Sequence, residues 1–206
     1  KRTPVPLPKP GYYIQEDNVA IEFNIPPATT SQEFVDSIMW SVDHIKSQIK
    51  TQSWDVKLQA SHHFPDSELQ TPEARKFGCE PDYNAWNYGR RNPRPKSDNV
   101  NLRTCGGHIH VGYPREWDNE KYFRFRLIQS MDLHLGVPSV YCDTDQTRRE
   151  LYGKAGSFRP TSYGAEYRVL SNFWLANKTR IKWAYNQTIR SINFALRKEN
   201  WLILDK

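Results

Sequence analysis

The sequence predicts an α+β domain, in which helices pack on one face of a largely antiparallel sheet. Several segments alternate apolar and polar residues with the period of a strand, and longer segments carry apolar stripes with the period of a helix. Turn-forming residues separate these segments, since the 206 residues include 14 Pro and 10 Gly. A chain of this length normally folds as one domain around one core.

The first helix is predicted from a start signal and an apolar stripe. Residues 16–25 alternate as a strand, and two prolines end it. Thr30 followed by Glu33 is the pattern of a capping box, which opens a helix. Apolar residues then recur every three or four positions at Val35, Ile38, Val42, Ile45 and Ile49. We therefore expect a helix over residues 30–50, next to a strand.

The remaining elements follow the same two periodicities. Strands are predicted over residues 53–61, 105–113 and 164–174, and helices over 119–135 and 176–198. Residues 62–103 are rich in Pro, Asp, Asn and Arg, and residues 143–160 form a basic stretch punctuated by Gly. Long irregular stretches inside one domain are often functional loops, so we expect residues 62–103 to be one.

Charge and cysteine content restrict the class of protein. The net charge of +6 favours an anionic partner, such as a nucleotide, a nucleic acid or an acidic peptide. Cys79, Cys105 and Cys142 lack the spacing of a disulfide framework or a zinc site, so we expect buried free thiols. No apolar run approaches the ~18 residues of a membrane helix, and the Pro-rich start differs from a signal peptide. We expect a cytoplasmic protein without a membrane partner.

Ionisable side chains share a face on three of the predicted strands. Period two puts Glu16 with Glu22, His108 with His110, and Glu166 with Arg168: six residues that are far apart in the sequence. Carboxylates and imidazoles that converge on a sheet surface can bind a divalent metal ion. An alternating Glu is also common on a solvated strand face. Glycines at 106, 107 and 112 favour a functional role for the histidines, because Gly weakens a strand and permits close backbone approach.

A second group of cations lies in the basic stretch. Arg148, Arg149, Lys154 and Arg159 occupy twelve residues around two glycines. Guanidinium groups pair with planar anions, and Gly exposes backbone N–H groups, so this stretch suits phosphate or carboxylate. Its sequence does not follow the P-loop pattern, and a solvated basic loop is the alternative.

Five ordered blocks of the sequence resemble one family. The blocks are IQEDNVAIEFNIPPA, FGCEPDYNAW, LRTCGGHIHVGY, RRELYGKAGSFRP and YGAEYRVLSNFW. They are similar to the phage-type carboxylate–amine ligases, which are type 2 amidoligases related to glutamine synthetase and glutamate–cysteine ligase. The resemblance covers residues 3–175. It implies a curved antiparallel sheet that forms a funnel, ATP and Mg²⁺ or Mn²⁺ as cofactors, and an acyl phosphate that an amine attacks.

The resemblance also implies roles for the candidate residues. By motif, Glu22 and Glu166 match metal ligands, with Glu16 or Asp17 as a companion to Glu22. His108 matches the histidine that binds the second metal ion or an ATP phosphate. Arg168 matches an arginine that contacts phosphate near the reacting centre, and Arg159 and Arg149 resemble arginines that hold the nucleotide and the acid. His110 lies beside His108, and Arg148 and Lys154 are reserves for nucleotide binding. The implied catalytic residues are Arg168, Arg159 and Glu166.

One departure from the family concerns the N-terminal end. Such ligases usually begin with a strand that carries paired acidic residues, and the sequence before residue 11 has no such pair. We expect residues 1–206 to form a single catalytic domain that lacks this first strand because the sequence starts after it. Loss of part of the metal site is the alternative, and binding would then survive without catalysis. The substrates would be a carboxylate and an amine, on small molecules or a peptide, in the cytoplasm of the host cell if a phage encodes the protein. An oligomer stays open, because funnels of this superfamily are sometimes completed by a neighbour.

Two other functions compete with the ligase. A cupin-like metal enzyme is suggested by His108, His110 and Glu116, but the spacing from His110 to Glu116 is too long and the long helices do not suit a jelly roll. A nucleic-acid-binding domain is suggested by the basic residues 89–96 and the abundant aromatic residues. Acids interspersed along the chain favour ordinary surface charge over this second alternative.

For the ligase, we assign Tyr83, Trp86 and Tyr88 to a wall or lid of the active site.

Overall fold

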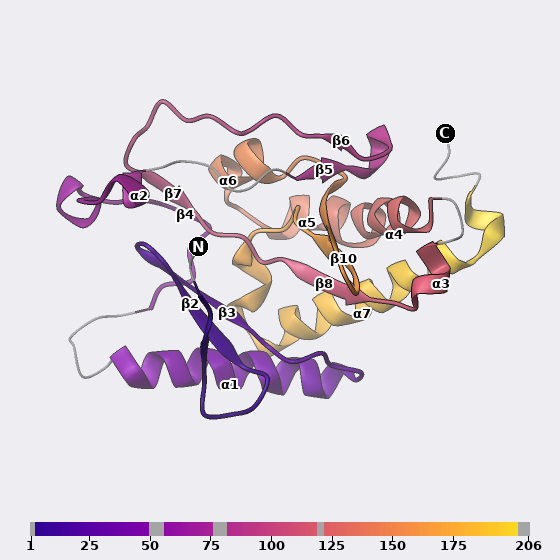
Figure 1. The fold of residues 1–206 in the computed structure, drawn as a ribbon, viewed down its shortest axis with the longest axis horizontal. Coiled ribbons are helices and arrows are strands. Elements are labelled where there is room, and N and C mark those ends of the chain that lie inside the picture. The colour runs from indigo at the N-terminus through magenta and orange to yellow at the C-terminus, as the bar shows by residue number, and fades with distance from the viewer. Residues whose placement is uncertain (1–2, 50–55, 76–81, 119–121, 202–206) are drawn as a thin grey trace.

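The computed structural model describes residues 3–49, 56–75, 82–118 and 122–201. It confirms the α+β class: antiparallel sheets are combined with helices, and none of the described sheets closes on itself (Figure 1). The described strands form three sheets, in the orders β1-β2-β3, β6-β5-β9-β10-β8 and β4-β7. In the described part of the chain, no helix is both long and apolar enough to cross a membrane.

The predicted strand over residues 16–25 is a hairpin. Strand β2 (Tyr13–Asp17) pairs with β3 (Ala20–Asn24), and β1 (Val5–Pro6) pairs with β2. Asn18 takes a left-handed conformation, with a φ of 57°, in the turn between β2 and β3. Asn tolerates this conformation better than most residues. The alternation in the sequence therefore continues across a turn that reverses the chain.

The five-stranded sheet has one apolar and one charged face. Its strands are β6 (Arg90–Arg91), β5 (Tyr83–Asn84), β9 (Ser157–Thr161), β10 (Gly164–Tyr167) and β8 (Ile109–Gly112). On the apolar face, Ile109, Phe158 and Tyr167 belong to the core cluster, together with Leu127 and Ile128 of helix α4 (Phe123–Met131). The predicted arrangement of a helix on one face is thus present.

The long helices form the other layer of the core (Figure 1). Helix α1 (Ser31–Ile49) opens with the predicted capping box: the Glu33 N–H donates to Thr30 Oγ1 over 3.2 Å, and the Thr30 N–H donates to Glu33 Oε2 over 3.1 Å. Helix α7 (Lys178–Leu196) packs against both α1 and α4. A π-helical turn (Asp132–Gly136) and α5 (Val137–Cys142) continue from the end of α4.

Short elements complete the fold. Strands β4 (Ser61–His63) and β7 (Leu102–Thr104) form the small sheet. The short α-helices are α2 (Pro72–Arg75), α3 (Arg115–Asp118) and α6 (Gln146–Tyr152), and 3₁₀ turns cover Asp66–Glu68, Ala85–Asn87, Asn172–Ala176 and Lys198–Asn200. The stretch 143–160 is therefore helical at α6, where Asp145 caps the helix by accepting from the Arg148 N–H.

Several boundaries differ from the sequence prediction. The strand expected over residues 164–174 ends at Tyr167, and the 3₁₀ turn at Asn172–Ala176 follows it. The strand expected over 53–61 begins outside the described residues, and β4 starts at Ser61. The expected helix over 119–135 also begins outside them. The expectation of buried thiols is wrong for Cys142, which is exposed, and Cys105 is half-buried. Cys79 lies outside the described residues.

Candidate active site

Four predicted site residues meet on the charged face of the five-stranded sheet. His108 Nδ1 lies 2.9 Å from Glu166 Oε1, and Arg168 Nη1 lies 3.3 Å from His108 Nδ1 and also contacts Glu166 Oε1. Arg159 Nη1 lies 3.4 Å from the other oxygen of Glu166. Glu166 and Arg168 are 5% and 7% exposed, so their charges are largely withdrawn from water. The cluster therefore has one carboxylate between two guanidinium groups and an imidazole.

Strand register explains why these residues meet. Glu166 on β10 is directly opposite Arg159 on β9 and His110 on β8. Residues opposite each other in an antiparallel pair point to the same face. Arg159, Glu166 and His110 thus form a row across three strands, and the Tyr163 hydroxyl lies 2.6 Å from His110 Nδ1 at one end of it. The period-two reading of the sequence put His110 and Glu166 on such a face, whereas Arg159 was expected in the basic loop and lies on β9.

The charges in the cluster fix its protonation states. Burial opposes ionisation of Glu166, but the His108 hydrogen bond and the charges of Arg168 and Arg159 outweigh it and lower its pKa to about 2. Burial lowers the pKa of His108 to about 4, and the positive charges of Arg168 and Arg148 act in the same direction. Burial also lowers the pKa of His110. At neutral pH the site therefore contains an ionised Glu166 and a neutral His108.

Two glycines allow His108 its position. A Cβ atom at Gly106 would overlap with Nε2 of the His108 ring, so the ring lies over the backbone at Gly106. A Cβ atom at Gly107 would overlap with Trp174 Nε1 and lie 2.6 Å from the Ser171 carbonyl oxygen. Trp174 Nε1 donates to the Gly107 carbonyl over 3.1 Å. Close approach therefore accounts for both glycines before His108.

A cavity adjoins the cluster on the same face. Its volume is about 270 Å³, and it lies between the extended segment 92–96 and the segment that links α6 to β9. The lining includes Asp82, whose Oδ2 lies 4.0 Å from Arg168 Nε, and three cations: Arg94, Lys96 and Lys154. Lys154, predicted to bind the nucleotide, therefore lines the same cavity as Asp82, the acid that faces Arg168.

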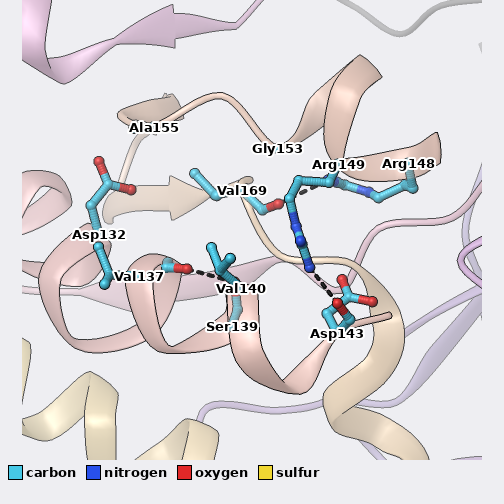
Figure 2. Close-up of a pocket in the computed structure, with 11 residues that line it drawn as sticks. Asp132, Val137, Ser139, Val140, Asp143, Arg148, Arg149, Gly153, Ala155 and Val169 are labelled. Atoms are coloured by element: carbon cyan, nitrogen blue, oxygen red, sulfur yellow. Dashed lines mark hydrogen bonds between the residues drawn. The ribbon is translucent and has the colours of Figure 1, made fainter. Parts of the chain in front are cut away.

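Arg148 and Arg149 lie elsewhere. Arg148 is 3% exposed, and its guanidinium donates to the carbonyl oxygens of Val169, over 2.8 Å, and Arg168, over 3.2 Å. Arg149 donates to the Asp143 carbonyl. Both line a second cavity, of about 150 Å³, next to Asp132, and Figure 2 shows Arg149 extending toward Asp143. In this structure Arg148 supports the backbone that carries Arg168. A nucleotide contact of either arginine stays a prediction.

Glu16 and Glu22 lie on the separate three-stranded sheet. Glu22 is opposite Gln15, whose Nε2 donates to it over 3.2 Å, whereas Glu16 is opposite Ile21. The two carboxylates therefore point to opposite faces, because the turn at Asn18 inverts the parity of the alternation. The expectation that they share a face is wrong. After burial, the charge of Glu22 is the next cause of the raised pKa of Cys105, which precedes His108 by three residues.

The donor set does not fit a metal ion held by the protein alone. The described residues contain no group of three or more His, Cys, Asp or Glu side chains placed to hold one. Glu166 and His108 lie together, but two guanidinium groups already pair with Glu166. Mg²⁺ is often bound by one or two carboxylates together with phosphate oxygens and water, and Glu166 fits only that arrangement.

Two acids near the cluster escaped the sequence analysis. Asp82 faces Arg168, as described above, and Asp132 lies behind β10 in the core. Asp132 accepts from Tyr167 Oη over 2.8 Å and from Trp86 Nε1 over 2.6 Å. Asp132 is the one acid in residues 123–136, and a single acid on a core-facing helix was the signal available for it.

The predicted aromatic wall is divided between two environments. Tyr83 packs on Phe158 at the core side, and Trp86 is tied to Asp132. Tyr88 is 62% exposed and contacts Tyr122 edge to face. Glu116, the third residue of the cupin alternative, is exposed on α3, apart from the strands that carry the two histidines.

Comparison with known proteins finds a family model that matches part of the chain. Residues 95–192 match the model of the family described as phage phiEco32-like COOH.NH2 ligase-type 2. No curated protein and no solved structure matches the chain. The matched stretch contains His108, Arg159, Glu166 and Arg168, and the family name denotes a carboxylate–amine ligase, which supports an enzymatic ligase. The resemblance of the sequence to the phage-type COOH-NH2 ligases of type 2 is thereby confirmed over residues 95–192.

Proposed function

We propose that this chain is an ATP-dependent carboxylate–amine ligase that forms an amide or isopeptide bond on an amino acid or peptide. The observation that carries the proposal is the cluster of His108, Arg159, Glu166 and Arg168 beside a cation-lined cavity, within the segment that matches the ligase family. A carboxylate is a poor electrophile, so it needs activation before an amine can attack it. Phosphorylation by ATP supplies that activation.

The reaction has two steps. An oxygen of the substrate carboxylate attacks the γ-phosphorus of ATP, and ADP leaves with the electron pair of the broken P–O bond. The amine nitrogen then attacks the acyl carbon, phosphate leaves, and loss of a proton from nitrogen gives the amide. Phosphoryl transfer depends mainly on positioning and on neutralising charge.

The cluster can meet the electrostatic part of this requirement. Arg168 and Arg159 provide planar cationic donors, which suit phosphate and carboxylate oxygens. Glu166 holds both guanidinium groups, and Arg148 holds the backbone carbonyl of Arg168, so the donors are oriented before the substrate binds. Mg²⁺, which the family resemblance implies, would neutralise charge on the nucleotide phosphates, with Glu166 as its candidate carboxylate.

The test is ADP formation in the presence of ATP, Mg²⁺ and a panel of acids and amines. We expect ADP only when both co-substrates are present, and mass spectrometry should detect a product equal to acid plus amine minus water. Glu166→Gln should lower the rate by a factor on the order of 10²–10³ or more, because the donors lose their orientation. Glu116→Gln removes an exposed carboxylate on α3 and serves as the matched control. Equal rates in the two variants would refute the assignment.

A further inference from the structure

The cavity beside Arg168 opens onto an edge strand. Strand β6 is the terminal strand of the five-stranded sheet, and Arg90 and Arg91 are exposed on it. The chain then continues without regular secondary structure through residues 92–96, which form one wall of the cavity. A ligand in the cavity could therefore extend along residues 90–96 without leaving the protein surface.

The charge along this surface is positive. Arg90, Arg91, Arg94 and Lys96 place four cations within seven residues, and Lys154 lines the cavity from the α6–β9 side. Two acids, Asp82 and Glu150, also line the cavity. The charge of Asp82 is partly offset by Arg168, whose Nε lies 4.0 Å from Asp82 Oδ2. Arg91 lies opposite Tyr83 and so points to the other face of β6. The remaining six side chains give four positive and two negative charges. The surface therefore favours a ligand with several negative charges.

The backbone of the segment suits an extended chain. Pro93 and Pro95 fix φ and lack N–H groups, so residues 92–96 cannot form a regular strand ladder with a neighbour. The edge of β6 can pair with an extended peptide only over its two residues. Recognition beyond that point must therefore come from the side-chain charges.

A polypeptide fits this surface better than a nucleic acid. Among the described residues that line the cavity, Tyr152 is the one aromatic side chain, and the Arg148 guanidinium lies 5.6 Å from its ring centroid. Binding of single-stranded nucleic acid usually depends on aromatic rings on which bases stack.

We propose that the cavity takes an Asp or Glu side chain of an acidic polypeptide, whose neighbouring residues lie along residues 90–96. The cavity volume of about 270 Å³ is slightly below the ~300–1,000 Å³ of pockets that enclose a drug-sized ligand. It therefore suits a side chain with its local backbone. This inference rests on the proposed function for the reaction at that carboxylate, but the binding itself needs no turnover.

Binding of a labelled peptide tests the proposal without ATP. The probe is a hexaglutamate peptide with an acetylated N-terminus and an amidated C-terminus, followed by fluorescence anisotropy at low salt, with hexaglutamine as the neutral peptide. The double variant Arg94→Gln/Lys154→Gln should weaken hexaglutamate binding by roughly tenfold, since each exposed charge pair contributes a factor of about 1.4 to 5. The control Lys57→Gln/Lys182→Gln removes two exposed lysines elsewhere and should change binding less than twofold.

Competition identifies the class of ligand. Free glutamate at the same carboxylate concentration should displace little of the labelled peptide; full displacement would mean that the site takes a free amino acid and would overturn the proposal. A hexathymidylate that binds more tightly than the peptide, and is lost in the same double variant, would overturn it in favour of nucleic acid. Equal loss of peptide binding in the control variant would also overturn the proposal, because binding would then be non-specific charge attraction.

The outcome can be separated from that of the ligase assay. ADP formation with other acids, combined with no hexaglutamate binding, would refute the polypeptide substrate and leave the ligase intact. Hexaglutamate binding that depends on Arg94 and Lys154, with no ADP formation from any acid and amine, would support the surface and refute the ligase.

Discussion

Two buried carboxylates with opposite pKa shifts lie on the two faces of β10: Glu166 belongs to the strand itself, and Asp132 belongs to the π-helical turn that packs behind it. On the charged face, Glu166 lies between Arg159, Arg168 and His108, and its pKa is lowered to about 2. On the core face, Asp132 accepts hydrogen bonds from Tyr167 and Trp86, and burial raises its pKa to about 6. Glu166 and Tyr167 are consecutive residues, so one peptide unit separates the two environments.

The difference lies in the kind of partner. Hydrogen bonds from neutral donors lower the pKa of Asp132 only in part, and burial prevails. Cations add a long-range attraction for the charged form, and around Glu166 they prevail over burial. Only the face with cations therefore has a permanent charge arrangement at neutral pH that suits work on anions. The core face has a carboxyl group that titrates near neutrality and fixes Tyr167 and Trp86.

Removal of Arg168 should have the largest effect on this contrast. Arg168→Met leaves Glu166 buried with one guanidinium and the His108 ring. Breaking a buried ion pair from one side typically costs ~3–5 kcal/mol, so we expect a loss of about 3 kcal/mol in the free energy of unfolding, measured by urea titration. Ligase activity should disappear. Arg168→Lys keeps the charge without the planar fork and should recover part of the stability but little activity; full activity in this variant would contradict the role of Arg168.

The second prediction concerns pH, because the two faces should respond with opposite signs. The pKa of Asp132 is raised, so its stabilising contribution is full below about 3.8 and is lost as pH rises through about 6. The pKa of His108 is lowered, so its contribution is full above about 6.5 and is lost as pH falls toward about 4. Each shift corresponds to roughly 3 kcal/mol. Between pH 4.5 and 6 the two contributions oppose each other in the native protein.

Two variants separate these contributions. Asp132→Asn removes the core titration, so the stability of this variant should fall as pH is lowered from 6 to 4.5. His108→Gln removes the titration of the imidazole on the charged face, so the stability of this variant should rise as pH is lowered over the same interval. Chemical denaturation at a series of pH values measures both slopes. Slopes of the same sign in the two variants would show that the two faces do not differ as described.

Sequence periodicity found the charged face for a specific reason. Residues His108, His110, Glu166 and Arg168 lie within or next to uninterrupted strands, where alternation fixes the face. It failed for Glu16 and Glu22 because a two-residue turn joins their strands: Asp17 is opposite Ala20, so residues of equal parity on the two strands end on opposite faces. Asn18, in the middle of the alternating stretch, was the residue that indicated a turn, because Asn tolerates the left-handed conformation that it adopts here.

The environment of an individual cation was beyond the reach of sequence. Arg148 and Lys154 occupy the same basic stretch, but α6 directs Arg148 to backbone carbonyls near Arg168, and the segment after it places Lys154 at the cavity. Asp145 helps to fix α6, since it accepts both from the Arg148 N–H and, over 2.6 Å, from the distant Ser61 hydroxyl. Such a contact depends on the tertiary fold and leaves no local pattern.

The glycines before His108 allow a third, smaller test. Gly106→Ala should displace the His108 ring, because the three heavy atoms nearest to the new Cβ all belong to that side chain. We expect activity to fall about tenfold, with a loss of less than ~1 kcal/mol in stability. Gly107→Ala meets a backbone oxygen and the Trp174 ring, so overpacking should lower stability by ~1–3 kcal/mol. Activity assays and thermal unfolding of the two variants distinguish the effects; a larger stability loss at Gly106 would contradict the description of the ring.

The smallest expected effect tests whether Glu22 belongs with the charged face despite its separate sheet. After burial, the Glu22 charge is the next cause of the raised pKa of Cys105, whereas Arg148 lowers it. In a background with Cys79 and Cys142 replaced by Ser, Glu22→Gln should therefore lower the pKa of the Cys105 thiol. The rate of Cys105 alkylation near pH 8 should rise about twofold, because an exposed charge contributes only a few tenths of a kcal/mol. Glu16→Gln, on the other face of the hairpin, is the matched control, and an equal rise in this variant would remove Glu22 from the neighbourhood of Cys105 and so from the charged face.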